Sequence, residues 1–359
     1  MRNMKYILAV DSFKGCLTSM EVEQVLGEAL REQGATVVAL PMSDGGEGML
    51  EAFTLALGGR IEKARVHDPL MRPITAEYGI APDGTAIIET SKACGLTLMA
   101  EDERNPWVAT SYGVGELVAQ AARQGARDFI IGLGGSGTSD AGIGMLRALT
   151  DAFAKGGTMG DALAGALRGC RFRLASDVRN PLCGERGAAQ VFGRQKGATE
   201  EMVAELDARA RRFAEISARH FGFDRSQDAG AGAAGGLGYA FLQYLDAKAQ
   251  SGADLLLDLI DFDRIIADAD VVVTGEGRAD RQTLMGKLPE RVLQRARKHG
   301  VGVWLMAGQV ADKDRLLQAG FAKVESITPE GLLLQEAMKP DVARANIRRW
   351  ATAAIGRKA

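Results

Sequence analysis

Short apolar runs in this 359-residue chain are repeatedly followed by turns rich in glycine and acidic residues. The run 6–10 leads into Asp11 and Lys14, and the run 129–133 leads into the glycines of 134–137. In an open parallel sheet such turns lie beyond the carboxyl ends of the strands, where ligands bind. Glycines let backbone N–H groups approach a ligand, and carboxylates can hold Mg²⁺ or accept a hydroxyl proton. These residue types suit phosphoryl transfer, in which a protein mainly positions substrates and neutralises charge.

Two glycine-rich segments are candidates for approaching phosphates. The first contains Gly134, Gly135, Ser136 and Gly137 and joins an expected buried strand to the start of a helix, an arrangement that binds anions. It lacks the full P-loop and dinucleotide-binding patterns, so a plain tight turn is the alternative. The second is 229–238, with Gly232, Gly235 and Gly236 among its residues. Such a run is costly to order unless something approaches its backbone, although small residues also allow close helix packing.

The acidic candidates each have a structural alternative. Asp44 and Asp140 precede expected helices, which they could cap. Asp177 lies between an apolar run and Asn180-Pro181, where a turn role is plausible. Glu276 and Asp280 flank Arg278 in an expected loop, and this dense charge favours a site over a cap. Lys14 and Lys287 add cations that suit phosphate or carboxylate charge.

Composition excludes several classes of function. A net charge of -2 and a pI near 6.1 give no basic footprint for nucleic acid or anionic lipid. No apolar run approaches the ~18 residues of a membrane helix. Three histidines argue against a zinc site, and four widely spaced cysteines indicate free thiols in a reducing compartment. A small-molecule substrate is therefore expected.

Alternation of short apolar runs with helical patterns predicts an α/β fold. The chain is longer than a usual single core, and the segments 61–66 and 74–80 indicate hairpin-like strands rather than β-loop-α units. We therefore expect two α/β domains. One is a doubly wound parallel sheet of the flavodoxin or Rossmann type, made of 1–60 and 265–359. The other is an inserted α/β domain, 61–264. Within the first, 271–273 is an expected strand and 274–280 the loop that follows it.

Six motifs in this order resemble the bacterial type I glycerate kinases, which are glycerate 2-kinases, over nearly the whole chain. They are Asp11-Ser12-Phe13-Lys14-Gly15, Asp44-Gly45-Gly46-Glu47-Gly48, Gly132-Leu133-Gly134-Gly135-Ser136, Val191-Phe192-Gly193 with Gln195-Lys196-Gly197-Ala198, Gly230 to Gly238, and Thr274-Gly275-Glu276-Gly277-Arg278 with Asp280, Gln282, Thr283, Gly286, Lys287 and Pro289.

The resemblance implies a cytoplasmic enzyme, monomeric or homodimeric, that uses ATP and Mg²⁺ to phosphorylate D-glycerate on its 2-hydroxyl in a cleft between two domains. On matching positions it implies a cleft lined by Asp11, Ser12, Lys14, Asp44, Glu47, Asp177, Asn180, Glu276, Arg278 and Asp280. Within this set we expect Asp177 or Asp280 to hold Mg²⁺, and Lys14 and Arg278 to bind the substrate carboxylate. Asp177, or failing that Asp44, is the expected acceptor of the hydroxyl proton. The glycines of 134–137 and 230–238 are expected at the ATP phosphates.

The chain departs from the family pattern at Val10, 137–141, Ser176 and Arg194, and it is shorter around 148–169. Two alternatives therefore stay open. One is a kinase for another small hydroxy acid, and the other is a nucleotide- or sugar-acid-binding regulator without catalysis. A nicotinamide dehydrogenase is disfavoured, because no strand is followed by G-x-G-x-x-G with an acid about twenty residues later.

Overall fold

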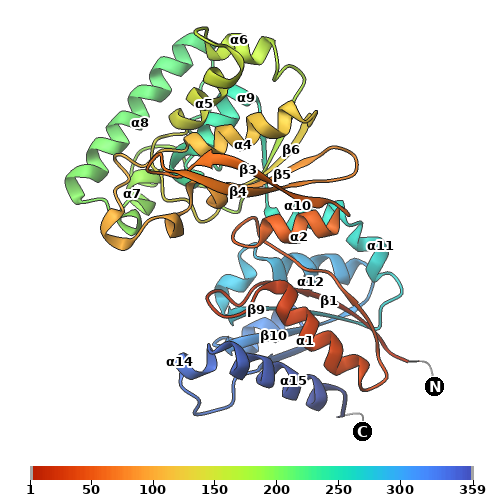
Figure 1. Cartoon of the computed structure of the whole chain (residues 1–359). Coiled ribbons are helices and arrows are strands. Elements are labelled where there is room, and N and C mark those ends of the chain that lie inside the picture. The colour runs from red at the N-terminus through yellow and green to blue at the C-terminus, as the bar shows by residue number, and fades with distance from the viewer. Residues whose placement is uncertain (1–2, 357–359) are drawn as a thin grey trace. The chain divides into compact units, whose positions relative to one another are not determined.

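A computed structural model of the chain describes residues 3–356, which divide into two compact units. The first unit combines the described residues of 1–44 and 253–359, and the second unit is 45–252. Figure 1 shows the first unit in the red and blue ends of the colour range, because the second unit is inserted into it.

The first unit contains a parallel sheet in the order β11-β10-β9-β1-β2. Its strands are β1 (Lys5–Val10), β2 (Thr36–Ala39), β9 (Val271–Ala279), β10 (Gly302–Val310) and β11 (Lys323–Ser326). The interior strand β1, between β9 and β2, is buried from Tyr6 to Val10, as expected for a parallel strand covered on both faces. Chain order reverses between β1 and β9, which is the doubly wound order of flavodoxin-like folds. The predicted fold class is confirmed.

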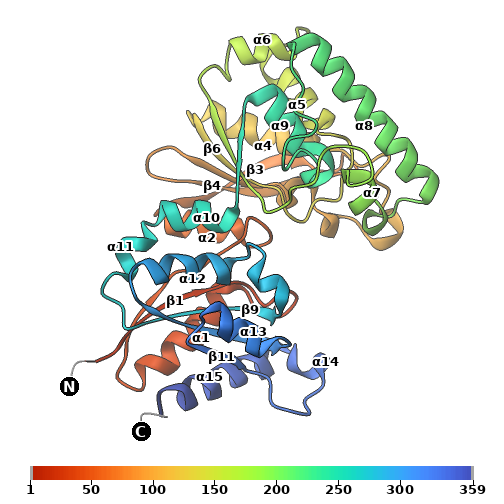
Figure 2. The same cartoon turned by 180° about the vertical axis from the view of Figure 1, so that it is seen from behind.

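Helices cover both faces of this sheet, as Figures 1 and 2 show. The helices α1 (Ser19–Arg31) and α15 (Pro340–Gly356) pack together on one face, and α12 (Leu288–Lys298) packs against β9 and β10 on the other. Thr18 and Glu21 start α1 with a reciprocal capping box, as the sequence predicted for this helix. The remaining elements are α10 (Gly252–Leu259), α11 (Phe262–Ile266), η5 (Arg281–Leu284), α13 (Lys313–Ala319) and α14 (Leu334–Ala337).

Two polar side chains of α1 bind the backbone at the end of β1. The Glu23 carboxylate accepts a hydrogen bond from the Val10 N–H at 3.0 Å, and the Ser19 hydroxyl donates to the Val10 carbonyl at 2.6 Å. The Ser19 hydroxyl also accepts from the Met42 N–H at 2.8 Å. Glu23 is 1% exposed, and its burial raises its pKa well above the usual value. These bonds fix the points at which the chain leaves β1 and approaches Asp44.

The strand β9 is longer than the sequence indicated. The expected loop 274–280 is a strand as far as Ala279, and Arg278 and Ala279 pair with Gln309 and Val310 of β10. Glycine and charged residues in this segment are typical of a loop. The segment is nevertheless a strand, because β10 extends far enough to supply hydrogen-bond partners for its backbone. Glu276 and Arg278 therefore project from a strand, and only Asp280 lies beyond it.

The second unit contains a mixed sheet in the order β3-β4-β5-β6-β7-β8. Its strands are β3 (Arg60–His67), β4 (Pro73–Ile80), β5 (Ala86–Glu89), β6 (Asp128–Gly132), β7 (Arg171–Ala175) and β8 (Lys248–Gln250). The predicted hairpin-like pair is present as antiparallel β3 and β4, and β5 to β8 are parallel. The second predicted α/β domain is thus confirmed in class.

The large apolar core of the second unit lies between this sheet and three helices, α4 (Tyr112–Arg123), α5 (Ile143–Phe153) and α9 (Leu237–Leu245). The helix α2 (Met49–Ala56) contacts β3, β4 and β5 from the other face (Figure 1). The other elements are α3 (Ser91–Cys94), η1 (Leu96–Leu98), η2 (Glu101–Glu103), α6 (Met159–Ala164), α7 (Ala188–Phe192), η3 (Arg194–Lys196), α8 (Glu200–Phe221) and η4 (Ala233–Gly236).

The units meet along the chain at 44/45 and 252/253, whereas the sequence placed the junctions near 60 and 265. The first difference arises from α2, which follows β2 in the chain but packs on the strands of the second unit. Within residues 3–356, none of the helices combines the length and apolar character needed to cross a membrane.

Candidate active site

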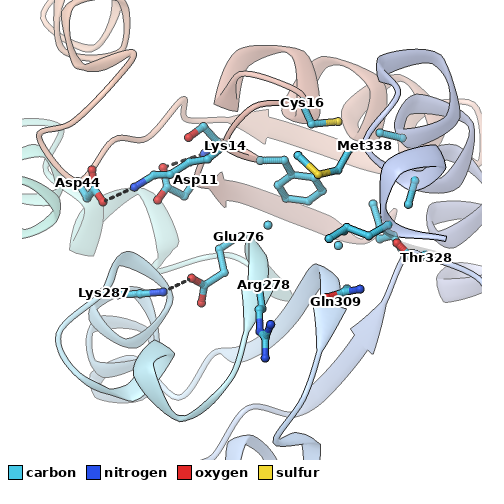
Figure 3. A pocket seen from close by; sticks show the side chains of 18 residues that line it. Asp11, Lys14, Cys16, Asp44, Glu276, Arg278, Lys287, Gln309, Thr328 and Met338 are labelled. Carbon is cyan, nitrogen blue, oxygen red and sulfur yellow. Dashed lines mark hydrogen bonds and ion pairs between the residues drawn. The ribbon is translucent and has the colours of Figure 1, made fainter. Parts of the chain in front are cut away.

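A cavity of about 370 Å³ lies in the first unit at the carboxyl ends of β1, β9 and β10. This is the point at which strand order reverses, where ligands of doubly wound sheets bind. Figure 3 shows its two ends. Asp11, Lys14, Asp44, Glu276 and Lys287 lie at one end, and Cys16, Thr328 and Met338 lie at the other.

The charged end begins with the loop that leaves β1. The Asp11 N–H donates to the Gly275 carbonyl of β9 at 2.9 Å, and the Asp11 carboxylate accepts from the Ser12 N–H at 2.8 Å. Burial, and after it the nearby Asp44 carboxylate, raises the pKa of Asp11 to about 7. The Lys14 ammonium lies 3.6 Å from the Asp44 carboxylate, which raises the pKa of Lys14. Asp11, Ser12, Lys14 and Asp44 therefore line the same cavity, and their contribution to a site stays a prediction.

Glu276 of β9 forms the floor of the charged end. It is 6% exposed, and its carboxylate accepts from the Thr283 hydroxyl at 2.6 Å and from the Lys287 ammonium at 2.8 Å. The lysine and the hydroxyl compensate the loss of water around this buried carboxylate. Lys287, at the start of α12, thereby brings a second cation beside Lys14 into the cavity.

Arg278 and Asp280 lie at the margin of this cluster. The Arg278 side chain is 65% exposed, lines the cavity and approaches the Asp280 carboxylate at 3.4 Å. Asp280 is the N-cap of η5, with its carboxylate accepting from the Gln282 N–H at 2.8 Å. The structure thus gives Asp280 a capping role that the charge pattern had disfavoured. Asp280 is not among the cavity-lining residues.

The other end of the cavity is apolar. Its walls come from Phe13 and Cys16 after β1 and from Ile327, Leu334 and Met338 near α14. The polar side chains of Gln309 and Thr328 lie among them, as Figure 3 shows. The sequence did not indicate that 327–338 contributes to a site, because apolar residues carry no chemical signature.

Besides the two glycine segments, three residues of the predicted cleft belong to the second unit. Asp177 is exposed and follows β7, and Asn180 donates from its amide to the Arg186 carbonyl at 2.8 Å. Glu47 is exposed in the loop before α2. Their predicted contribution to the site stays a prediction. Asp177 and Asp280, the two predicted Mg²⁺ ligands, lie in different units.

The loop 134–137 is closely packed against protein. The Gly134 and Gly137 N–H groups donate to the carbonyls of Gly45 and Cys94, and a side chain at Gly134 would overlap the Gly46 backbone. Ser136 accepts from the buried ammonium of Lys196 at 3.0 Å. The same ammonium donates to the Thr138 carbonyl at 2.7 Å, and burial lowers the pKa of Lys196 to about 8. The sequence missed this anchoring lysine, although its motif includes Lys196.

The run 229–238 also has a packing explanation. Its glycines at 232, 235 and 236 are buried. A side chain at Gly232 would overlap the Pro181 carbonyl, and one at Gly235 would overlap the Thr138 carbonyl. Gly235 additionally has a φ of +65°, in the left-handed region that favours glycine. Of the two alternatives that the sequence left open, close packing is therefore observed. Phosphate binding by these glycines stays a prediction.

The carboxylates of the charged end suit Mg²⁺, which takes oxygen ligands and is commonly bound through one or two carboxylates together with substrate phosphates. Within residues 3–356, no group of three or more His, Cys, Asp or Glu could hold a metal ion by itself.

Comparison with known proteins places the chain among a defined set of relatives. A model of the glycerate kinase family matches residues 6–357. The glycerate kinase of Bacillus subtilis (strain 168) is 40% identical, covering 94% of this chain and 93% of its own. The glycerate 2-kinase of Escherichia coli (strain K12) is 38% identical, covering 98% and 99%.

A similar solved structure is that of a protein assigned as glycerate kinase 2 in Salmonella typhimurium LT2. It superposes with a TM-score of 0.83 at 36% identity, covering 99% of this chain and 98% of its own. The superposition covers nearly all of both chains. In this chain, the region around 148–169 contains the end of α5 and the helix α6.

Replacing Gly235 tests the close packing of the glycine run. Gly235→Ala should lower the free energy of unfolding by about 3 kcal/mol or more, because it adds a backbone overlap to the cost of the left-handed conformation. The matched control is Gly222→Ala, since Gly222 has a φ of +78° with open space around it. That variant should lose only about 1 kcal/mol. Urea unfolding measures both, and equal losses would show that Gly235 is not closely packed.

Replacing Asp11 tests its raised pKa. The folded state keeps the Asp11 proton up to a pH of about 7, whereas the unfolded chain releases it near pH 4, so this group destabilises the fold as the pH rises between these values. Asp11→Asn cannot ionise, and its gain in Tm over the unmodified protein should grow from pH 5 to pH 8. Asp314→Asn, at an exposed acid of α13, is the control and should show no such trend. A gain that is independent of pH would contradict the assignment.

Proposed function

The chain belongs to the glycerate kinase family, and we propose that it transfers the γ-phosphoryl group of ATP to the 2-hydroxyl of D-glycerate, giving 2-phosphoglycerate, with Mg²⁺ as the metal ion. One observation carries this proposal. Two lysines and three carboxylates meet at the strand-order reversal of a doubly wound sheet. Support for the 2-hydroxyl comes from the name of the Escherichia coli relative, a glycerate 2-kinase. The cytoplasmic location and the monomeric or dimeric state stay predictions.

The charged end of the cavity meets the main demand of phosphoryl transfer. Negative charge on the transferring group must be neutralised, and this is mostly electrostatic work. Lys14 and Lys287 supply ammonium groups, and each is held by a carboxylate partner, Asp44 or Glu276. The expectation that Asp177 or Asp280 holds Mg²⁺ stays a prediction, and among the carboxylates that line the cavity we propose Asp11 and Asp44 as ligands. When bound, Mg²⁺ would neutralise phosphate charge beside the lysines.

Recognition of the acceptor needs a cation for its carboxylate and a base for its hydroxyl. Arg278 can provide a bidentate grip, and its 65% exposure leaves it able to reorient toward a substrate. Lys14 is the second candidate for the carboxylate. We propose Asp177 as acceptor of the hydroxyl proton, with Asp44 as the alternative, since both carboxylates lie in loops that follow strands, β7 and β2.

Identification of the product tests the proposed reaction. Purified protein incubated with ATP, Mg²⁺ and D-glycerate should form ADP and 2-phosphoglycerate in equal amounts, and chelation of Mg²⁺ should stop the reaction. ³¹P NMR separates the 2-phosphate from the 3-phosphate. A panel of other small hydroxy acids serves as the comparison. Preferential turnover of one of them would reassign the substrate, and binding without any turnover would indicate a regulator.

Asp177→Asn tests the proposed proton acceptor. Loss of a general base should lower kcat by about 100-fold or more, while Tm and circular dichroism stay unchanged. The matched control is Glu205→Gln on the exposed side of α8, which should keep full activity. Full activity of Asp177→Asn would rule out Asp177 as the proton acceptor and leave Asp44 as the candidate.

A further inference from the structure

The cavity of the first unit is larger than the proposed acceptor requires. About 370 Å³ is a volume typical of sites for drug-sized ligands, well beyond a three-carbon acid. The charged end accounts for the acid and for phosphate groups. The apolar end, between Phe13 and Met338, is not used by either.

The apolar end exposes large side chains at its mouth. Leu334 and Met338 line the cavity and are 52% and 38% exposed, and Leu333 beside them is 76% exposed. Apolar surface next to a cavity favours a ligand with an apolar face, because burying it removes the surface from water. The ligand must also tolerate the charged end, since both ends belong to one cavity.

Two polar side chains at this end are available for directional recognition. Figure 3 shows Gln309 and Thr328 together on the side away from Lys287. Within residues 3–356, neither the side-chain amide of Gln309 nor the side-chain hydroxyl of Thr328 makes a hydrogen bond. A heterocyclic base needs both features, because its faces are apolar and its edge carries donors and acceptors.

Two glycines of the sheet line the cavity. Gly277 follows Glu276 in β9, and Gly308 precedes Gln309 in β10. A side chain at Gly308 would lie 2.6 Å from the Gly277 carbonyl, so these backbones are in contact. An elongated ligand can therefore run from the apolar end to the two lysines close to the main chain.

We propose that the apolar end binds the purine base of the nucleotide donor. Phe13 and Met338 contact the base, Gln309 and Thr328 bind its edge, and the phosphates pass Gly277 and Gly308 to reach Lys14 and Lys287. This inference rests on the proposed function and makes the first unit the nucleotide-binding unit. It differs from the prediction that the glycines of the second unit hold the phosphates. Those glycines are instead closely packed against protein backbone.

The experiment fills the apolar end and measures binding without turnover. Ala337 lines the cavity from α14, so Ala337→Phe should weaken ATP binding, measured by calorimetry, about tenfold or more. Inorganic tripolyphosphate has no base, and its affinity should stay unchanged. The matched control is Gln335→Phe, an exposed position of the same helix that does not line the cavity, and its ATP affinity should equal that of the unmodified protein.

A second variant guards against misfolding of the first. Gln309→Ala should weaken ATP but not tripolyphosphate, and Tm confirms that each variant is folded. Unchanged ATP affinity in both variants, or equal losses for ATP and tripolyphosphate, would overturn the inference. Because binding is measured without acceptor, the expected pattern in a protein that fails to phosphorylate D-glycerate would reject the proposed function and keep this site.

Discussion

Parallel pairing of β1 with β9 is the interaction on which the candidate site depends. The pairing runs from Tyr6 with Val271 to Val10 with Gly275, and it ends with the Asp11 N–H on the Gly275 carbonyl. It therefore places the first residue after one strand beside Glu276 of the other. The next helices, α1 and α12, depart to opposite faces of the sheet, so neither one fills the space above the pair. Glu23 and Ser19 of α1 fix the carboxyl end of β1, because they bind the N–H and the carbonyl of Val10.

The same pairing brings several carboxylates close together, an arrangement that is unfavourable for the folded state. Asp11 approaches Asp44 and Glu276, and its raised pKa reflects burial together with this repulsion. Lys14 and Lys287 relieve part of the cost, each beside a carboxylate. Groups held in such an environment are commonly functional, because solvated surface positions would serve stability better. The cluster thus indicates that this sheet edge is adapted to bind a charged ligand at some expense to the folded state.

Local sequence predicted the positions of helices and strands better than it predicted which parts of the chain pack against them. Apolar runs located β1 and β6, and the segments 61–66 and 74–80 located β3 and β4. The segment 274–279 was wrong as a loop, since its strand state depends on a partner distant in the chain. A glycine such as Gly235 indicates that another group lies close to its backbone. The sequence does not distinguish whether that group is a ligand or, as here, a carbonyl of the protein. The apolar walls of the cavity gave no signal, because their chemistry matches that of ordinary core residues.

Insertion of the second unit between β2 and α10 determines the order in which the protein can be assembled during translation. The nascent chain presents β1 and β2 long before β9 leaves the ribosome, and the whole of 45–252 emerges in between. The second unit has its own apolar core and can become compact during this interval. Until β9 arrives, β1 lacks one of its two partner strands and exposes a strand edge that favours aggregation.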